Sequence, residues 1–269
     1  MNNSLLEQSL PDYSVTGQSD TTIFMLHGAF GAKEYWYYQI EALVKNGYRV
    51  VAWDAPGYGL SEMPEEFSIE SLARVCCHLI NTLGTKTNIV MGHSMGGMIA
   101  QRAYDYLPEK IHGLVLSATS AAFGGRGGDW QKKFVSDRVA PLDSGLTIPQ
   151  YAPTMLKNMM TPAAEGRAVD LVLQVVSLMR EETFRAAIEA ITHFEGRDVL
   201  PKMNVPVLCI AGELDLTAAP PKVMEKMASK ITDAEFHCMS NVGHFGWAEN
   251  PQEFNRLLVD FLRRKINVS

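Results

Sequence analysis

The sequence lacks the features that mark a nucleic-acid-binding or membrane-spanning chain. It has no long run of lysine or arginine, and its 24 basic residues are outnumbered by 30 acidic ones, so the net charge is −6. The longest apolar stretches, such as residues 23–26 and 205–210, are strand-sized. A membrane span needs ~20 apolar residues. We therefore expect no nucleic-acid partner and no membrane association.

Cysteine is also scarce, and its spacing does not suggest a metal site. Of the four cysteines, Cys76 and Cys77 are adjacent on a predicted helix, while Cys209 and Cys238 lie in predicted strands. No CxxC pair or Cys/His ligand spacing occurs. This pattern favours reduced, packed cysteines over disulfides or zinc. The first ten residues lack the basic and apolar segments of a secretion signal, so we expect a cytoplasmic protein.

The composition is that of a folded chain. Its 269 residues are 46% hydrophobic and 20% charged, which argues against disorder. A chain of this length fits one large domain, or one domain with an insertion, and can bury a substantial core.

Short apolar segments alternate with segments of helical periodicity, except between residues 120 and 201. Strands are predicted at 22–26, 48–53, 87–91, 111–117, 205–211 and 234–239. Helices are predicted at 35–45, 69–83, 94–107, 220–229 and 251–264. This alternation predicts an α/β fold with a mainly parallel central sheet flanked by helices.

Residues 120–201 interrupt the alternation and contain no convincing strand. They open on the flexible sequence GGRGG and continue with helical segments. Thr161 and Pro162 have the residue types of a helix N-cap and first turn, which predicts that the helix over 168–180 begins there. We therefore expect a helical cap at 120–201, inserted after the fourth parallel strand. The core would consist of residues 1–119 and 202–269.

One motif carries a candidate nucleophile. Gly92-His93-Ser94-Met95-Gly96 matches G-x-S-x-G and lies between a predicted strand and a predicted helix. A tight strand-to-helix turn strains its central residue and exposes the Ser94 hydroxyl above the sheet edge. The backbone N–H of Met95 then points to where an oxyanion forms.

A serine hydroxyl requires a base, and the base requires an orienting acid. Of the seven histidines, His244 follows the last predicted strand, whereas His27 and His93 are better placed for local hydrogen bonds. Asp215 follows a strand and lies further out on its loop than its rival, Glu213. All three preferred residues fall at the carboxyl edge of the sheet, where open α/β sheets bind ligands.

Five motifs follow one another along the sequence: HGAFG, DAPGYGLS, GHSMGG, AGELD and NVGHFGWAENP. With them the chain resembles the α/β-hydrolase fold superfamily over essentially its whole core. The segment before residue 22 is short, so the antiparallel strands that usually lead this fold must be abbreviated.

The resemblance implies a role for each matching residue. Ser94 would be the nucleophile, His244 the general base and Asp215 its partner. The backbone N–H groups of Ala29 and Met95 would form the oxyanion hole. Such a site needs no metal and no organic cofactor. We expect a serine hydrolase acting on a small or medium carboxylic ester or a lactone, and parts of the chain also resemble 3-oxoadipate enol-lactonases. Two alternatives stay open: a C–C bond hydrolase of aromatic ring-cleavage products, and a non-enzymatic ligand receptor that retains the triad.

Three residues are candidates for contact with a small-molecule substrate. Phe30 lies in the glycine loop, and Trp36 belongs to an aromatic cluster of which one member could reach the pocket. Arg126, between two glycine pairs, has the chemistry to bind a substrate carboxylate, although a solvated loop arginine is the favoured interpretation. The sequence leaves a homodimer open.

Overall fold

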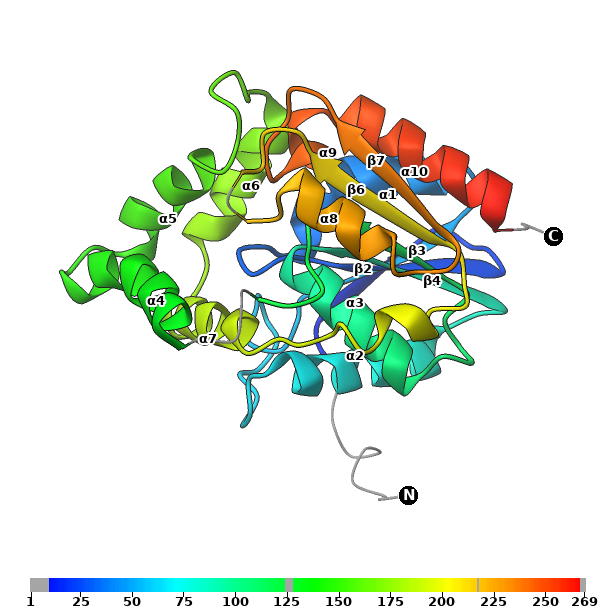
Figure 1. The fold of residues 1–269 in the computed structure, drawn as a ribbon, viewed down its shortest axis with the longest axis horizontal. Coiled ribbons are helices and arrows are strands. Elements are labelled where there is room, and N and C mark those ends of the chain that lie inside the picture. Colours follow the sequence, from blue (N-terminus) through cyan, green and yellow to red (C-terminus); the bar gives the residue numbers. More distant parts are fainter. Residues whose placement is uncertain (1–9, 124–127, 217, 267–269) are drawn as a thin grey trace.

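The computed structural model describes residues 10–123, 128–216 and 218–266. Within these residues the centre is a seven-stranded sheet in the order β1-β3-β2-β4-β5-β6-β7 (Figure 1). The strands are β1 Tyr13–Thr16, β2 Thr21–Leu26, β3 Arg49–Trp53, β4 Thr87–His93, β5 Gly113–Ser117, β6 Val207–Gly212 and β7 Ala234–Met239. β1 pairs antiparallel with β3, and the remaining neighbours pair in parallel. The predicted mainly parallel sheet is confirmed, with β1 as a short leading antiparallel strand.

The central strands are covered on both faces. All residues of β2 and β6 are buried. Along β2, Phe24 and Leu26 belong to one hydrophobic cluster, and Ile23 and Met25 belong to another. Since successive side chains of a strand point to opposite faces, the two clusters lie on either side of the sheet. This explains why the strands are continuously apolar rather than alternating with polar residues.

Helices outside the insertion form the two outer layers. They are α1 Tyr37–Lys45, α2 Ile69–Leu83, α3 Met95–Tyr106, α8 Pro221–Ala228, α9 Gly246–Glu249 and α10 Pro251–Lys265. Buried side chains of α2, α3 and α8 join the cluster that contains Phe24, whereas those of α1 and α10 join the cluster that contains Ile23. Two short 3₁₀ helices complete the described part, η2 Lys33–Trp36 and η3 Leu200–Lys202. No helix in the described ranges is long and apolar enough to cross a membrane.

Four helices are inserted between β5 and β6 and gather at one end of the sheet (green in Figure 1). They are α4 Gly128–Asp143, α5 Ile148–Lys157, α6 Arg167–Ser177 and α7 Glu181–Thr192. One expectation here is wrong, because α6 begins at Arg167 after Gly166, not at Thr161. The backbone N–H of Thr161 instead donates to the carboxylate of Glu249, 2.8 Å away. Thr161 thus makes a long-range contact, and no helix of the described residues begins at it. The limits of a separate cap domain stay a prediction.

All four cysteines lie in the described residues and are free. Cys238 is exposed, whereas Cys76 and Cys209 are buried and Cys77 is half-buried. Burial raises the pKa of Cys77 and of Cys209 to about 12. Because the thiolate is the reactive form, these thiols should resist modification.

We therefore expect Ellman's reagent at pH 8 to modify one thiol per native chain, at Cys238, and all four after denaturation in guanidinium chloride. Absorbance at the nitrothiobenzoate band measures the stoichiometry, and the Cys238→Ser variant is the control. Rapid release of two or more equivalents from the native protein would contradict the buried positions.

Candidate active site

Ser94 occupies the tight turn between β4 and α3. Its φ of 52° and ψ of −117° lie outside the regions that a serine normally adopts. Its backbone N–H donates to the Ser117 carbonyl at 2.9 Å, and the Thr119 hydroxyl donates to the Ser94 carbonyl at 2.7 Å. A Cβ on Gly92 would collide with the carbonyl of Gly96. A backbone conformation of this kind costs of order 1–3 kcal/mol, and the two hydrogen bonds help to maintain it. Glycine at position 92 avoids the collision with the Gly96 carbonyl.

Asp215 and His244 meet at the carboxyl ends of β6 and β7. The Nδ1 of His244 lies 2.6 Å from Oδ2 of Asp215, and both residues are nearly fully buried. The same carboxylate accepts the backbone N–H groups of Ala218 at 3.0 Å and Ala219 at 3.1 Å. Burial alone would raise the pKa of Asp215, but His244 and these two N–H groups hold it below its usual value. The ionised carboxylate accepts from Nδ1–H and leaves Nε2 of His244 as the free acceptor.

Glu213, the rival acid, is engaged elsewhere. Its carboxylate accepts the backbone N–H of Asn241 at 2.9 Å. The structure therefore places Asp215, rather than Glu213, on the imidazole of His244.

Ser94 and His244 line the same cavity of about 200 Å³. Both residues lie within the ranges that the structure describes, and no hydrogen bond joins the Ser94 hydroxyl to His244. In a site without substrate such a contact is often long and tightens on binding. The acid–histidine pair is thus already assembled, and Ser94 lines the same cavity as His244.

The two histidines nearest this site have local partners. Nε2 of His27 accepts the backbone N–H of Ala55 at 3.0 Å, so its Nδ1–H donates to the Gly28 carbonyl at 2.8 Å. The bond to Gly28 is local, as predicted, whereas the bond to Ala55 joins the loops that follow β2 and β3. His93 packs against His244 with their ring centroids 4.8 Å apart. Burial, followed by the electrostatic influence of His244, holds the pKa of His93 well below its ordinary value, so this ring is neutral.

Two backbone donors near Ser94 have no hydrogen-bond partner in the described part of the chain: the N–H groups of Ala29 and Met95. Met95 is the first residue of α3, where the helix end leaves its N–H free. Ala29 lines the cavity with Ser94. The preceding N–H, that of Gly28, is already bonded to the Tyr35 hydroxyl at 2.7 Å. These unpaired donors can stabilise an oxyanion.

The residues predicted to contact a substrate have three different outcomes. Phe30 lines the Ser94 cavity and packs against Phe184 of α7, with ring centroids 5.5 Å apart. Trp36 does not reach the cavity, which corrects that prediction. It is fully buried and packs against Trp247 at 4.7 Å, because the large ring is better accommodated in the core. Arg126 lies outside the described residues.

Sequence reasoning missed Glu249, whose carboxylate fastens the histidine loop. One oxygen accepts the backbone N–H groups of Gly243 at 3.0 Å and Phe245 at 3.2 Å, on either side of His244. The other oxygen accepts the N–H of Thr161, in the inserted segment. Its position within the motif NVGHFGWAENP was the available signal. Glu249 thus fixes the loop from both sides.

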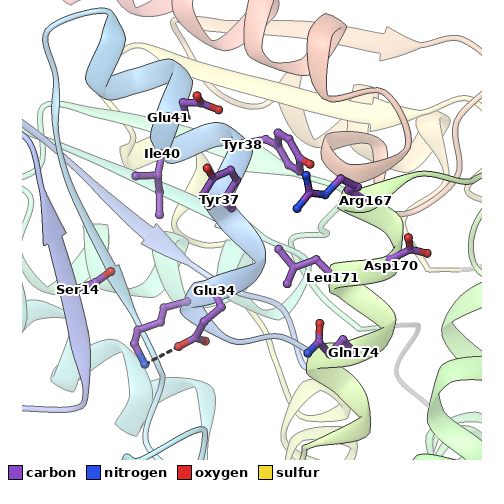
Figure 2. A pocket seen from close by; sticks show the side chains of 11 residues that line it. Ser14, Glu34, Tyr37, Tyr38, Ile40, Glu41, Arg167, Asp170, Leu171 and Gln174 are labelled. Carbon is purple, nitrogen blue, oxygen red and sulfur yellow. Dashed lines mark ion pairs between the residues drawn. The ribbon is translucent and has the colours of Figure 1, made fainter.

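A larger hollow of about 770 Å³ lies elsewhere, between α1 and α6. Figure 2 shows Tyr37, Tyr38 and Glu41 on one wall and Arg167 and Asp170 on the other. It contains neither Ser94 nor His244, so its size does not make it the candidate site.

Comparisons with known proteins identify the family of the chain. The 2-hydroxy-6-oxononadienedioate/2-hydroxy-6-oxononatrienedioate hydrolase of Paraburkholderia phymatum is 27% identical over 274 residues, covering 93% of this chain and 90% of that protein. The enol-lactonase structure from Burkholderia xenovorans is 25% identical, with a TM-score of 0.81 over 94% of this chain and 96% of that one. An esterase structure from Thermogutta terrifontis, 23% identical, shares the fold with a TM-score of 0.81 over 95% and 94% of the two chains. A model of the alpha/beta hydrolase family matches residues 23–257. The chain belongs to this family and has the α/β-hydrolase fold.

Proposed function

We propose that this protein is a serine hydrolase that cleaves a small or medium carboxylic ester or a lactone through an acyl-enzyme. The observation that carries the proposal is the buried pair of Asp215 and His244, 2.6 Å apart, whose histidine lines one cavity with Ser94 on its strained turn. These three side chains come from three separate strand ends. The same constellation supports nucleophilic catalysis on unrelated folds.

In the proposed reaction Nε2 of His244 takes the proton of Ser94 as Oγ attacks the substrate carbonyl. Asp215 keeps the other ring nitrogen protonated and stabilises the imidazolium that forms. The N–H groups of Ala29 and Met95 bind the oxyanion. His244 then gives its proton to the leaving oxygen, and a water molecule hydrolyses the acyl-enzyme by the reverse steps.

The test combines turnover with covalent labelling. We expect p-nitrophenyl esters of acetate to octanoate to be hydrolysed above background. A fluorophosphonate should abolish this activity as one adduct forms per chain, located on the Ser94 peptide by mass spectrometry. A labelled protein that hydrolyses no ester or lactone would contradict the proposal and favour the receptor alternative.

A second candidate function, C–C bond hydrolysis of an aromatic ring-cleavage product, is supported by the 27% identical hydrolase of Paraburkholderia phymatum. The substrate of such a C–C bond hydrolase is a coloured dienol. Loss of that absorbance, at a rate exceeding ester hydrolysis, would favour this function over the first.

A Glu249→Gln variant tests the fastening of the proposed base. Glutamine has one acceptor oxygen and cannot accept from both Gly243 and Thr161. Since small misplacements of catalytic groups are costly, we expect kcat to fall on the order of 10–100-fold while KM changes less than about threefold. Rates of fluorophosphonate labelling should fall in parallel, because both reactions need the base.

The matched control for this variant is Glu253→Gln, whose carboxylate binds Arg256 on the exposed side of α10. It should retain kcat. An unchanged kcat in Glu249→Gln, with the native melting temperature, would show that Glu249 does not position His244.

A further inference from the structure

An arginine from the inserted helices lines the proposed catalytic cavity. Arg138 of α4 is half-buried and shares the cavity wall with Ser94 and His244. Its guanidinium carbon lies 3.4 Å from the centroid of the Phe134 ring, and one N–H donates to the Phe134 carbonyl at 3.3 Å. These contacts hold the guanidinium against an aromatic ring in the cavity that Ser94 and His244 also line.

Arg138 has no carboxylate partner in the described part of the chain. The adjacent carboxylate, that of Asp137, binds Lys133 at 2.8 Å instead. No aspartate or glutamate is among the described residues that line the cavity, and residues 124–127 have the sequence GGRG, without an acid. Burial lowers the pKa of Arg138, yet a guanidinium stays charged at neutral pH. Among the described residues, the cavity therefore holds a partly desolvated positive charge that no carboxylate contacts.

The side chains packed around Arg138 are aromatic. Phe123 and Trp130 pack with ring centroids 4.8 Å apart, and Phe123 and Phe134 pack at 4.5 Å. A ligand that matches this wall has an apolar or aromatic body. A ligand that matches Arg138 carries an anionic group, which a planar guanidinium binds best as a carboxylate.

We propose that Arg138 binds a free carboxylate of the substrate, so that the preferred substrate is an ester or lactone that carries a second, anionic carboxylate group. The inference rests on the proposed function of Ser94. An anionic group of the substrate would stabilise the Arg138 guanidinium electrostatically, because no carboxylate of the described residues pairs with this guanidinium in the free protein. The overall net charge of −6 makes anion selection depend on this local group rather than on the field of the whole protein.

The kinetic test compares esters that differ by one carboxylate. One pair is p-nitrophenyl butyrate and mono-p-nitrophenyl succinate, which places the charge on the acyl side. The other is phenyl acetate and 4-acetoxybenzoate, which places it on the leaving group. In at least one pair we expect wild-type kcat/KM to be at least tenfold higher for the anionic ester. Arg138→Gln should lose at least tenfold on that ester and less than threefold on its neutral partner.

Two further variants make the comparison specific. Arg138→Lys keeps the charge without the planar donor pair and should retain part of the preference. Arg167→Gln removes an exposed arginine of α6 that lines the other hollow (Figure 2), and it should leave the preference unchanged. Circular dichroism melts identify any variant that fails to fold, in which case Arg138→Lys carries the comparison.

A binding arm separates the failure of this inference from the failure of the proposed function. Titration calorimetry with phenylacetate and phenylacetamide needs no turnover. We expect the anion to bind wild type at least tenfold more tightly than the amide, and this difference to vanish in Arg138→Gln. Equal affinities, or a preference that persists in Arg138→Gln, would overturn the role of Arg138 even if esters are hydrolysed. Absence of ester hydrolysis with an Arg138-dependent preference would overturn the hydrolase proposal alone.

Discussion

Replacing Ser94 with alanine is expected to lower kcat/KM for p-nitrophenyl butyrate by on the order of 10⁴–10⁶-fold. The variant lacks the attacking oxygen, so only the oxyanion donors and substrate binding remain to assist water. Alanine is about as strained as serine at a φ of 52°, and no hydrogen bond joins the Ser94 hydroxyl to His244. We therefore expect the free energy of unfolding to change by less than about 1 kcal/mol.

Stopped-assay hydrolysis and thermal melts measure the two effects of Ser94→Ala separately. The matched control is Ser120→Ala, because Ser120 lines the same cavity and its hydroxyl donates to the Ala122 carbonyl at 3.1 Å. That variant should keep kcat/KM within about threefold. Retention of more than a few per cent of activity by Ser94→Ala would assign the nucleophile to another group.

An Asp215→Asn substitution is expected to lower kcat by about 10⁴-fold. The carboxylate accepts from His244, Ala218 and Ala219, whereas an asparagine side chain has a single acceptor oxygen. Either the imidazole or a backbone N–H then faces an NH₂ group. In the first case the ring adopts the wrong tautomer, and in both cases the negative charge that stabilises the imidazolium is lost.

The same variant has a signature in the pH dependence of stability. The pKa of Asp215 is lower in the folded protein than in an unfolded chain. Its ionised form thus contributes stability above the unfolded value of about 3.9, and this contribution is lost as the pH falls through the lower folded pKa. Melting temperatures of wild type and Asp215→Asn should converge as the pH is lowered from 6 to 3. Glu213→Gln is the control, and a kcat as low as that of Asp215→Asn would contradict the assignment.

Local patterns were sufficient to predict the sheet and the position of Ser94. The G-x-S-x-G sequence requires small residues around a strained turn, and the structure shows why, since a Cβ on Gly92 would strike a backbone carbonyl. Strand-end placement also predicted that Asp215 and His244 lie close together. These features depend on residues near one another in the chain and on the geometry of parallel strands.

Contacts between distant segments could not be predicted in this way. Glu249 and Thr161 are 88 residues apart, and no local pattern predicts their hydrogen bond. Trp36 is placed by its packing on Trp247, and nothing local distinguishes that from exposure in a pocket. Arg138 was missed because the sequence does not show that it lines the cavity or that no described carboxylate pairs with it. Both properties depend on how α4 packs in the folded protein.

Two contacts of the histidine loop with the inserted segment constrain how this family member can diverge. The backbone N–H of His244 donates to the carbonyl of Met159 at 2.9 Å, and Glu249 ties the same loop to Thr161. The inserted segment therefore cannot be exchanged without affecting the loop that carries His244. In a chimera that takes residues 120–201 from another enzyme, His244 should keep its position only if the graft places a carbonyl where Met159 has one and an N–H where Thr161 has one. New substrate ranges should arise more readily by changing side chains on α4 than by replacing the turn after α5.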